Sequence, residues 1–305
     1  MTRSGVSPDL ATALLSNAEI ELGITTSVGP RVIRLARRGG SNVFVELPDA
    51  MLECPAGGTF RLRGGHRLWV APEVPPITYL PDDEPVILKT GTDTISATTP
   101  AGETGVERTI VVSLGTAGSI VVDHVVGNRG ELSFSAAAWA ITQLPPDGIA
   151  VLPQTIETAD PWGVQPNRSV VLWPYTDPGA PGVEWTATSV VIRGVEDPRP
   201  FKIGVENRRG WLAHWRSGEL FVKWSRIHRD DADYLDRGAS AQVYRNDRFI
   251  ELETLSPLTV LAPGERIEHR EVWRLHRASV ENVSDLTEVL ASIEAEGPPP
   301  ELGGS

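Results

Sequence analysis

Short runs rich in β-branched residues, separated by glycine and proline, recur along almost the whole chain. The 29 glycines and 25 prolines are spread rather than clustered, so they punctuate the runs as turn residues do. Many strands with turn signals between them are typical of an all-β sandwich or barrel. The runs that we expect to form strands are 19–26, 30–36, 42–47, 59–63, 67–71, 109–114, 119–126, 132–144, 169–173, 189–192, 201–206, 211–215, 220–225, 239–245, 249–255 and 266–276.

Only two segments carry helical signals. Residues 8–17 form one candidate helix. Residues 284–296 form the other, in which Ser284 could act as the N-cap and apolar residues recur at helical spacing. This apolar stripe consists of Leu286, Val289, Leu290 and Ile293.

The domain organisation follows from what the sequence lacks. No internal repeat and no linker interrupt the strand pattern, and 305 residues suffice for one large all-β domain. We therefore expect a single domain over residues 18–297, preceded by an N-terminal segment, 1–17. The last residues, 298–305, read PPPELGGS, a composition that predicts a disordered tail.

Composition and charge exclude several classes of partner. The chain carries 28 basic and 40 acidic side chains, a net charge of −12, so neither nucleic acid nor an anionic membrane is expected to bind it. The single cysteine, Cys54, forms no internal disulfide and no cysteine metal cluster. The first residues resemble no signal peptide, and no apolar run is long enough to span a bilayer. We therefore expect a soluble cytoplasmic protein without cofactor.

The segment from Phe249 to Trp273 is the most informative for function. It reads as strand, Pro-Gly turn, strand. In the first strand Ile250 and Leu252 share one face, while Glu251 and Glu253 share the other, about 7 Å apart. Two carboxylates on one strand face indicate either a solvated surface or the floor of a polar site, and this segment alone leaves both open.

Four segments, in the same order along the chain, resemble the galactose mutarotase (aldose 1-epimerase) superfamily. The C-terminal one, ELETLSPLTVLAPGERIEHREVW at 251–273, resembles the L-E-T strand and PG-E turn of that superfamily. GGHRLWVAPE at 64–73 is similar to its arginine-bearing loop. WAITQLPPDG at 139–148 resembles the strand that ends in T-N-H, and GPRVIRLARRGGSNVFVEL at 29–47 resembles the opening hairpin.

This resemblance implies a β-supersandwich in which large twisted antiparallel sheets stack and a sugar binds in a concave cleft. The ligand it implies is a small-molecule sugar or a glycan. Its L-E-T glutamate, Glu253 here, would be the general base that takes the proton of the anomeric hydroxyl. Burial or the neighbouring Glu251 could raise the pKa of this carboxyl toward the working pH.

The general acid is where the sequence departs from the superfamily. The T-N-H histidine is replaced by Thr142-Gln143-Leu144, and a glutamine can hydrogen-bond a hydroxyl but cannot deliver a proton. We expect His66, in the Gly-Gly-His-Arg loop, to serve as the acid, with His214 as second choice. An alternative is that His66 is a loop histidine bonded to backbone.

The remaining candidates are sugar-binding residues. Arg67 has the planar fork that suits two oxygens at once. Gln143 and Glu251 offer hydrogen bonds, and Trp69 and Trp139 offer faces on which a sugar ring can stack, although core packing is the simpler interpretation of any one tryptophan.

Three functions remain open at this point. The chain could be an aldose epimerase, a carbohydrate-binding protein without chemistry, or a glycoside hydrolase or lyase with paired carboxylates. The acidic segment 230–236 lacks the glycine and the closing glutamate of an EF-hand, and we expect no metal site.

Overall fold

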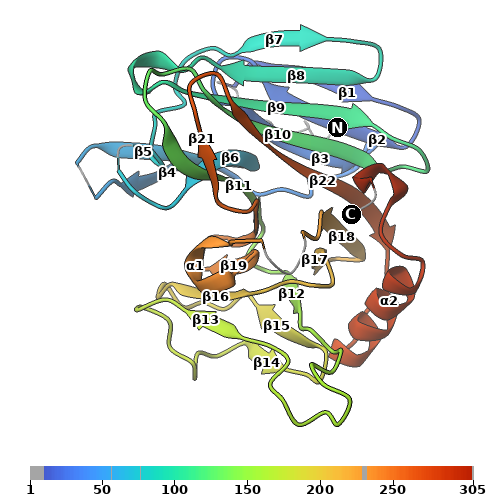
Figure 1. Ribbon diagram of the computed structural model, residues 1–305. Coiled ribbons are helices and arrows are strands. Elements are labelled where there is room, and N and C mark those ends of the chain that lie inside the picture. The colour runs from blue at the N-terminus through green and yellow to red at the C-terminus, as the bar shows by residue number, and fades with distance from the viewer. Residues whose placement is uncertain (1–9, 56, 76, 229–231, 304–305) are drawn as a thin grey trace.

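The computed structural model describes residues 10–303 except 56, 76 and 229–231. Within these residues the chain forms two large antiparallel sheets that pack face to face, as expected of a β-supersandwich (Figure 1). Their buried sides share one core, in which Leu22 and Val32 of the first sheet pack with Ile110 and Val122 of the second. The prediction of an all-β fold is therefore confirmed.

The first sheet carries the site described below. Its hydrogen-bonded order is β1–β2–β3–β6–β11–β20–β19–β16–β13, with β21 also paired to β11. The strands span Thr12–Ser16 (β1), Ile20–Thr25 (β2), Arg31–Arg37 (β3), His66–Ala71 (β6), Phe134–Leu144 (β11), Val170–Leu172 (β13), Phe201–Val205 (β16), Ala241–Arg245 (β19), Ile250–Leu255 (β20) and Thr259–Leu261 (β21).

The second sheet has the order β14–β15–β12–β17–β18–β22–β10–β9–β8–β7. Its strands span Ile87–Thr90 (β7), Thr94–Thr99 (β8), Val106–Leu114 (β9), Ile120–Asn128 (β10), Ile149–Pro153 (β12), Val183–Trp185 (β14), Ser189–Arg193 (β15), Trp211–Arg216 (β17), Glu219–Ser225 (β18) and Arg266–Arg277 (β22).

Smaller elements cover the outer faces of the two sheets. The hairpin of β4 (Glu46–Glu53) and β5 (Thr59–Gly64) packs Phe60 against Trp69 of the first sheet. The helix α2 (Val283–Ala295) packs its apolar stripe on the second sheet. The short segments are η1 (Gly102–Thr104), α1 (Leu235–Gly238) and η2 (Pro300–Leu302).

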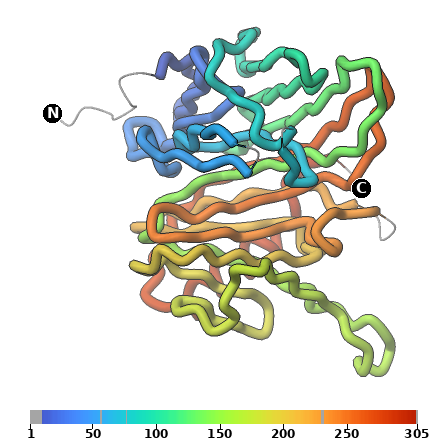
Figure 2. The backbone as a smooth tube through the Cα atoms, turned by 90° about the vertical axis from the view of Figure 1, so that its left-hand side faces the viewer, coloured from blue at the N-terminus to red at the C-terminus, as the bar shows by residue number. Residues whose placement is uncertain are grey.

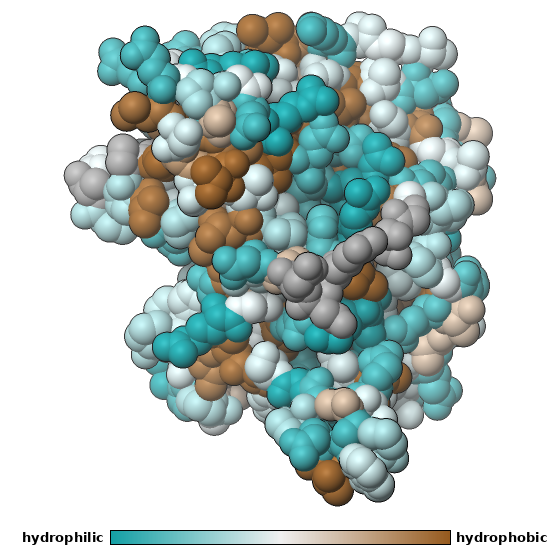
Figure 3. All heavy atoms as spheres, viewed as in Figure 1, coloured by the Kyte–Doolittle hydropathy of each residue, from teal (hydrophilic) through white to brown (hydrophobic). Residues whose placement is uncertain are grey.

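Between β12 and β13 the chain protrudes from the body of the molecule, as Figure 2 shows in yellow-green. Trp162 and Val164 of this segment are exposed, and the carboxylate of Asp160 accepts hydrogen bonds from the backbone N–H groups of both. The face drawn in Figure 3 mixes hydrophilic and hydrophobic side chains, as protein surfaces commonly do. No helix within the described ranges has the length and apolar character needed to cross a membrane.

Of the two helices expected from the sequence, the structure contains one. The C-terminal helix is confirmed, although its N-cap is Asn282, which forms a reciprocal capping box with Asp285, rather than Ser284. The expected helix at 8–17 is wrong within its described part, because Thr12–Ser16 pairs with Ile20–Thr25 as an edge strand. Tertiary pairing thus overrides local helix propensity there.

Two further expectations differ from the structure. Residues 42–47 are not a strand throughout, because the Asn42 side chain binds the backbone of residues 33, 35 and 44 and holds a loop, and β4 begins only at Glu46. Residues 298–303 do not form a disordered tail. Leu302 packs into the apolar cluster under α2, and Glu301 accepts hydrogen bonds from the hydroxyls of Ser119 and Thr116. Residues 304–305 lie outside the described residues.

The Gly64-Gly65 pair allows the backbone to approach three other chain segments, at residues 32, 45 and 143. Gly65 donates its N–H to Val45 and accepts from the N–H of Gln143, and its φ is +72°. A Cβ placed on Gly65 would lie 2.4 Å from the carbonyl oxygen of Val32. The glycine therefore provides both a left-handed conformation and room for the neighbouring strand.

We predict that Gly65→Ala is strongly destabilising. The positive φ alone costs about 1–2 kcal/mol, and relieving the backbone contact adds about 1–3 kcal/mol. The control is Gly218→Ala, because Gly218 has a φ of +84° and a Cβ added there would meet no atom within 4 Å. Urea unfolding of both variants measures the difference, and equal losses of stability would show that the close contact has no effect.

Candidate functional site

The outer face of the first sheet carries a set of polar and aromatic side chains, which we call the site face. Strand register assigns them to three rows across β6, β11, β20, β19 and β16. Residues opposite one another in register share a sheet face. The rows are Gln143–Glu251–Tyr244–Lys202, Arg67–Ile141–Glu253–Gln242–Gly204 and Trp69–Trp139–Leu255.

Glu253 lies at the centre of the site face and is fully buried. Its Oε2 accepts hydrogen bonds from Lys202 Nζ at 2.8 Å and from Trp139 Nε1 at 2.8 Å. Its Oε1 has no hydrogen-bond partner among the described residues. Burial, the largest cause, raises the pKa of Glu253; Lys202 opposes this shift and Glu251 adds to it.

Lys202 is enclosed by two tryptophans. Its ammonium lies 4.7 Å from the ring centroid of Trp139 and 4.7 Å from that of Trp173. Trp173 follows β13 and approaches Gly204, where a side chain would come within 3.2 Å of its ring. The aromatic faces and the Glu253 carboxylate together stabilise a cation at this position.

Glu251 has a separate set of partners. Its Oε1 accepts from Arg67 Nη2 at 2.9 Å and from Gln143 Nε2 at 3.0 Å. The Arg67 guanidinium lies 4.3 Å from the ring centroid of Trp69, and this ring packs edge to face with Trp139. Each carboxylate of β20 is thus paired with its own cation, and each cation lies over a tryptophan ring.

Several buried polar atoms of the site face have no hydrogen-bond partner in the described structure. Buried donors and acceptors in proteins are nearly always paired, with protein, water or ligand. The unpaired set includes both donors and acceptors, as a ligand with many hydroxyl groups would require. The atoms are Arg67 Nε and Nη1, Trp69 Nε1, Gln143 Oε1, Gln242 Oε1 and Glu253 Oε1.

His66 lies on the other face of the sheet, between the two sheets. Its Nδ1 bonds the hydroxyl of Thr142 at 2.9 Å, and its Nε2 lies 2.6 Å from Nε2 of His124. The carbonyl of His269 can only accept, so Nδ1 of His124 donates to it. Burial lowers the pKa of both His66 and His124, in agreement with neutral rings.

This buried network also holds an ion pair. Lys223 Nζ lies 2.7 Å from Glu271 and donates to Thr142 at 3.2 Å. The ligand atoms of His66, His124 and Glu271 lie within 4.8 Å of one another, which is a spacing that a metal ion could use. The ammonium of Lys223 already supplies the positive charge there, and the ring nitrogens bond one another, so we assign no ion to this cluster.

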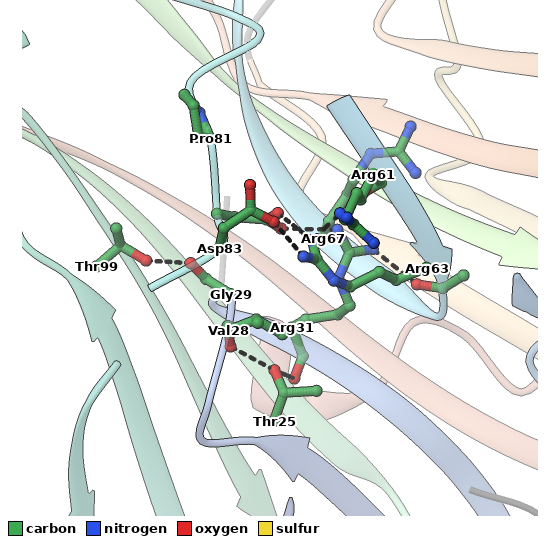
Figure 4. A network of polar contacts seen from close by, with 12 residues as sticks. Thr25, Val28, Gly29, Arg31, Arg61, Arg63, Arg67, Pro81, Asp83 and Thr99 are labelled. Carbon is green, nitrogen blue, oxygen red and sulfur yellow. Dashed lines mark hydrogen bonds and ion pairs between the residues drawn. The ribbon is translucent and has the colours of Figure 1, made fainter. Parts of the chain in front are cut away.

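An arginine cluster borders the site face at its β3 edge. Asp82 accepts from Arg31 at 2.8 Å and from Arg63 at 2.6 Å, and Arg31 also donates to the Gly64 carbonyl at 2.7 Å. Figure 4 shows Arg31, Arg63 and Arg67 gathered in one network. Burial acts to raise the pKa of Asp82, but Arg31 and Arg63 outweigh burial and lower it. Through the bond from Arg31 to the Gly64 carbonyl, the network holds the start of β6, the strand that carries Arg67.

The chain has no match among protein-family models or among curated proteins. Solved structures do match. A galactose mutarotase-like protein from Lactobacillus casei has a TM-score of 0.55 and 12% identity, with 87% of this chain and 100% of that chain covered. A galactose mutarotase related enzyme from Lactobacillus acidophilus has a TM-score of 0.54 and 10% identity, covering 87% and 97%. The chain has the galactose mutarotase-like fold.

The same fold also forms part of a larger neighbour. A TPR-domain containing protein from Parabacteroides distasonis matches with a TM-score of 0.57 and 15% identity over 90% of this chain and 48% of that one. At such identities the likeness concerns the fold, and the roles of individual side chains rest on the geometry of the site face.

Six of the seven predicted site residues lie together on this mutarotase-like fold. These are Glu253, Glu251, Arg67, Trp69, Trp139 and Gln143. His66 does not join them, because it directly precedes Arg67 in β6 and successive residues of a strand point to opposite faces. The second choice, His214, lies on β17 of the other sheet, with its Nε2 3.2 Å from the Pro145 carbonyl.

Sequence reasoning gives no site role to Trp173 or Gln242, and it treats Lys202 only as one of several cations in later strands that could line a cleft. A surface charge is the simpler interpretation of Lys202 from sequence, although its place between Phe201 and Ile203 in an apolar strand is an available signal. Gln242 bonds Asp236 of the acidic segment at 2.7 Å, so this segment does reach the site face. Asp230 and Asp231 lie outside the described residues.

We predict that Asp82→Asn lowers the free energy of unfolding by about 3–5 kcal/mol at pH 7, because the buried Arg31 loses its carboxylate partner and Arg63 loses one of its two. The pKa of Asp82 is lowered in the folded state, so the stabilisation is complete above the unfolded carboxyl pKa and is lost as pH falls through the folded value. The difference between wild type and variant should therefore shrink below about pH 4.

The control for this experiment is Asp83→Asn. Asp83 also pairs with Arg63, but its side chain is half exposed, so its loss should cost no more than about 1 kcal/mol. Urea unfolding from pH 3 to 7 measures both variants. A pH-independent difference for Asp82→Asn would contradict the electrostatic explanation.

Proposed function

We propose that this chain binds a sugar on the site face and accelerates epimerisation of an aldose at its anomeric carbon, with Glu253 as general base. The observation that carries the proposal is the state of Glu253. This carboxyl is buried, has a raised pKa, is fixed through Oε2 and keeps Oε1 without a partner among the described residues. A general base needs that combination of fixed geometry and a pKa nearer the working pH.

The other side chains of the site face support sugar binding. Arg67, Gln143 and Gln242 offer unpaired donors and acceptors beside the aromatic faces of Trp69 and Trp139. Sugars present apolar C–H faces and a rim of hydroxyls, which is the chemistry that such a surface recognises. The names of the solved neighbours, a galactose mutarotase-like protein and a galactose mutarotase related enzyme, agree with this ligand class.

The proposed reaction is a reversible ring opening. Glu253 Oε1 takes the proton of the anomeric hydroxyl, the bond from the anomeric carbon to the ring oxygen breaks, and the ring oxygen takes a proton from an acid. Rotation about the bond to the next carbon presents the other face of the carbonyl. Closure by the reverse steps gives the other anomer and restores both groups.

A second candidate is a carbohydrate-binding protein without chemistry. One observation favours it: all six histidines of the chain lie in the described ranges, and none of them is among the side chains of the site face. A hydrolase or lyase would need Glu251 or Glu253 to act with a carboxylate of the acidic segment such as Asp233, because Glu251 and Glu253 project from the same strand and cannot flank a bond from opposite sides.

We predict that the wild type speeds anomer exchange of at least one free aldose above the spontaneous rate, and that Glu253→Gln reduces this by at least about 100-fold. Glutamine keeps the shape of the side chain but accepts no proton at this pH. The rate should fall on the acid side through the pKa of Glu253, which lies above the ordinary carboxyl value. Exchange is measured by NMR on a panel of aldoses from pH 4 to 9.

The matched control is Glu268→Gln, an exposed glutamate of β22 that pairs with Arg266 at the surface. It should exchange anomers at the wild-type rate. Background exchange in the wild type together with sugar-dependent line broadening would replace the epimerase proposal with the binding one. Background exchange without broadening would reject both.

A further inference from the structure

We infer that Lys202 is the proton donor of the site. The inference rests on the proposed epimerase function and extends it. Two observations carry it: the contact between Lys202 and the proposed base, and the absence of another competent donor among the described residues of the site face.

The distance between Lys202 and Glu253 fits the reaction. The hydroxyl that loses a proton and the ring oxygen that gains one are bonded to the same carbon, so acid and base must lie within a few ångströms of each other. Lys202 Nζ lies 2.8 Å from Glu253 Oε2, while Oε1 has no partner among the described residues. A sugar whose anomeric hydroxyl reaches Oε1 therefore has its ring oxygen beside the ammonium.

The charges of the pair also fit the direction of proton flow. At the start Glu253 is a carboxylate and Lys202 an ammonium. As the ring opens, one proton passes from the hydroxyl to Glu253 and another from Lys202 to the ring oxygen, so both buried charges are neutralised together. Closure returns each proton to its residue, with no net change. Neutralising two charges at once is favourable in a buried site, where an isolated charge is costly.

The other polar residues of the site face are poorer donors. Arg67 does not give up its proton in a protein, and the amides of Gln143 and Gln242 cannot deliver one. Burial raises the pKa of Tyr244 to about 12, which weakens it as an acid.

The surroundings of Lys202 are suited to a residue that cycles between charged and neutral forms. Trp139 and Trp173 contact the ammonium without removing its proton, since an aromatic ring is no base. Thr176 bonds both the N–H and the carbonyl of Lys202 through its hydroxyl, which fixes the backbone from which the side chain extends. Apart from Glu253, the groups that contact the amine or fix its backbone cannot take its proton.

The test compares Lys202→Met and Lys202→Arg with wild type in the full chain. Initial rates are followed by polarimetry on freshly dissolved aldose anomers from pH 5 to 10, after thermal unfolding has shown which variants fold. Arginine keeps a cation beside Glu253 but does not release its proton. We expect Lys202→Arg to lose at least about 100-fold in kcat with KM within about threefold, and Lys202→Met to lose as much at every pH.

The pH profile separates a donor from a merely structural cation. If Lys202 served only to keep Glu253 ionised, Lys202→Arg would stay active. Lys202→Met would then recover its rate at high pH, because Glu253 is ionised there without help. Either result overturns the inference.

The controls distinguish this inference from the proposed function. Lys89→Met removes an exposed lysine of β7 and should leave the rate unchanged. An inactive wild type rejects the epimerase itself and the donor role with it. An active wild type with an equally active Lys202→Met rejects only the role of Lys202. If Lys202→Met fails to fold, the kcat of Lys202→Arg alone decides.

Discussion

Side chains alternate along β20 between two buried faces, and both faces carry charged or polar groups. Glu251 and Glu253 point outward to the site face, while Leu252 and Thr254 point inward toward the second sheet. A shift of register by one residue would exchange the two sets and leave both without their partners. The position of the site therefore depends on the pairing of β20 with β11 more than on any single contact.

The sandwich contains two lysine–glutamate pairs, one on each face of the first sheet. Lys202 with Glu253 lies on the site face, and Lys223 with Glu271 lies between the sheets. Removing such charges from water is costly, and only well-formed hydrogen bonds offset the cost. The inner pair is satisfied by the hydroxyls of Thr142 and Thr254 and by the indole N–H of Trp273, whereas the outer one leaves Glu253 Oε1 without a partner in the described part of the chain. That difference is why we propose a ligand contact for the outer pair and not for the inner one.

The strand pattern of the sequence predicts the all-β fold class, and the resemblance of four segments to the galactose mutarotase superfamily points to most residues of the site face. The alternation of side chains along the strand correctly predicts that Glu251 and Glu253 share one face, because alternation depends only on neighbouring residues. The prediction of site residues fails for His66, because a neighbour in sequence, Arg67, belongs to the opposite face of the strand. The sequence pattern does not predict the contact between Lys202 and Glu253. These residues lie on β16 and β20 with β19 between them, and no local pattern encodes that arrangement. The edge strand at Thr12–Ser16 is missed for the same reason, since only pairing reveals it.

The C-terminal residues have a consequence for how the chain is handled. Leu302 lies in the same apolar cluster as Leu286 and Leu290, and the Glu301 carboxylate accepts a hydrogen bond from the hydroxyl of Ser119, which directly precedes β10. Removal of the residues after Gly297 by an exopeptidase would expose apolar side chains that α2 and the second sheet share with Leu302, without removing any residue of the site face. The protein would then be more prone to self-association. A short stretch that looks dispensable in the sequence thus protects the protein from self-association.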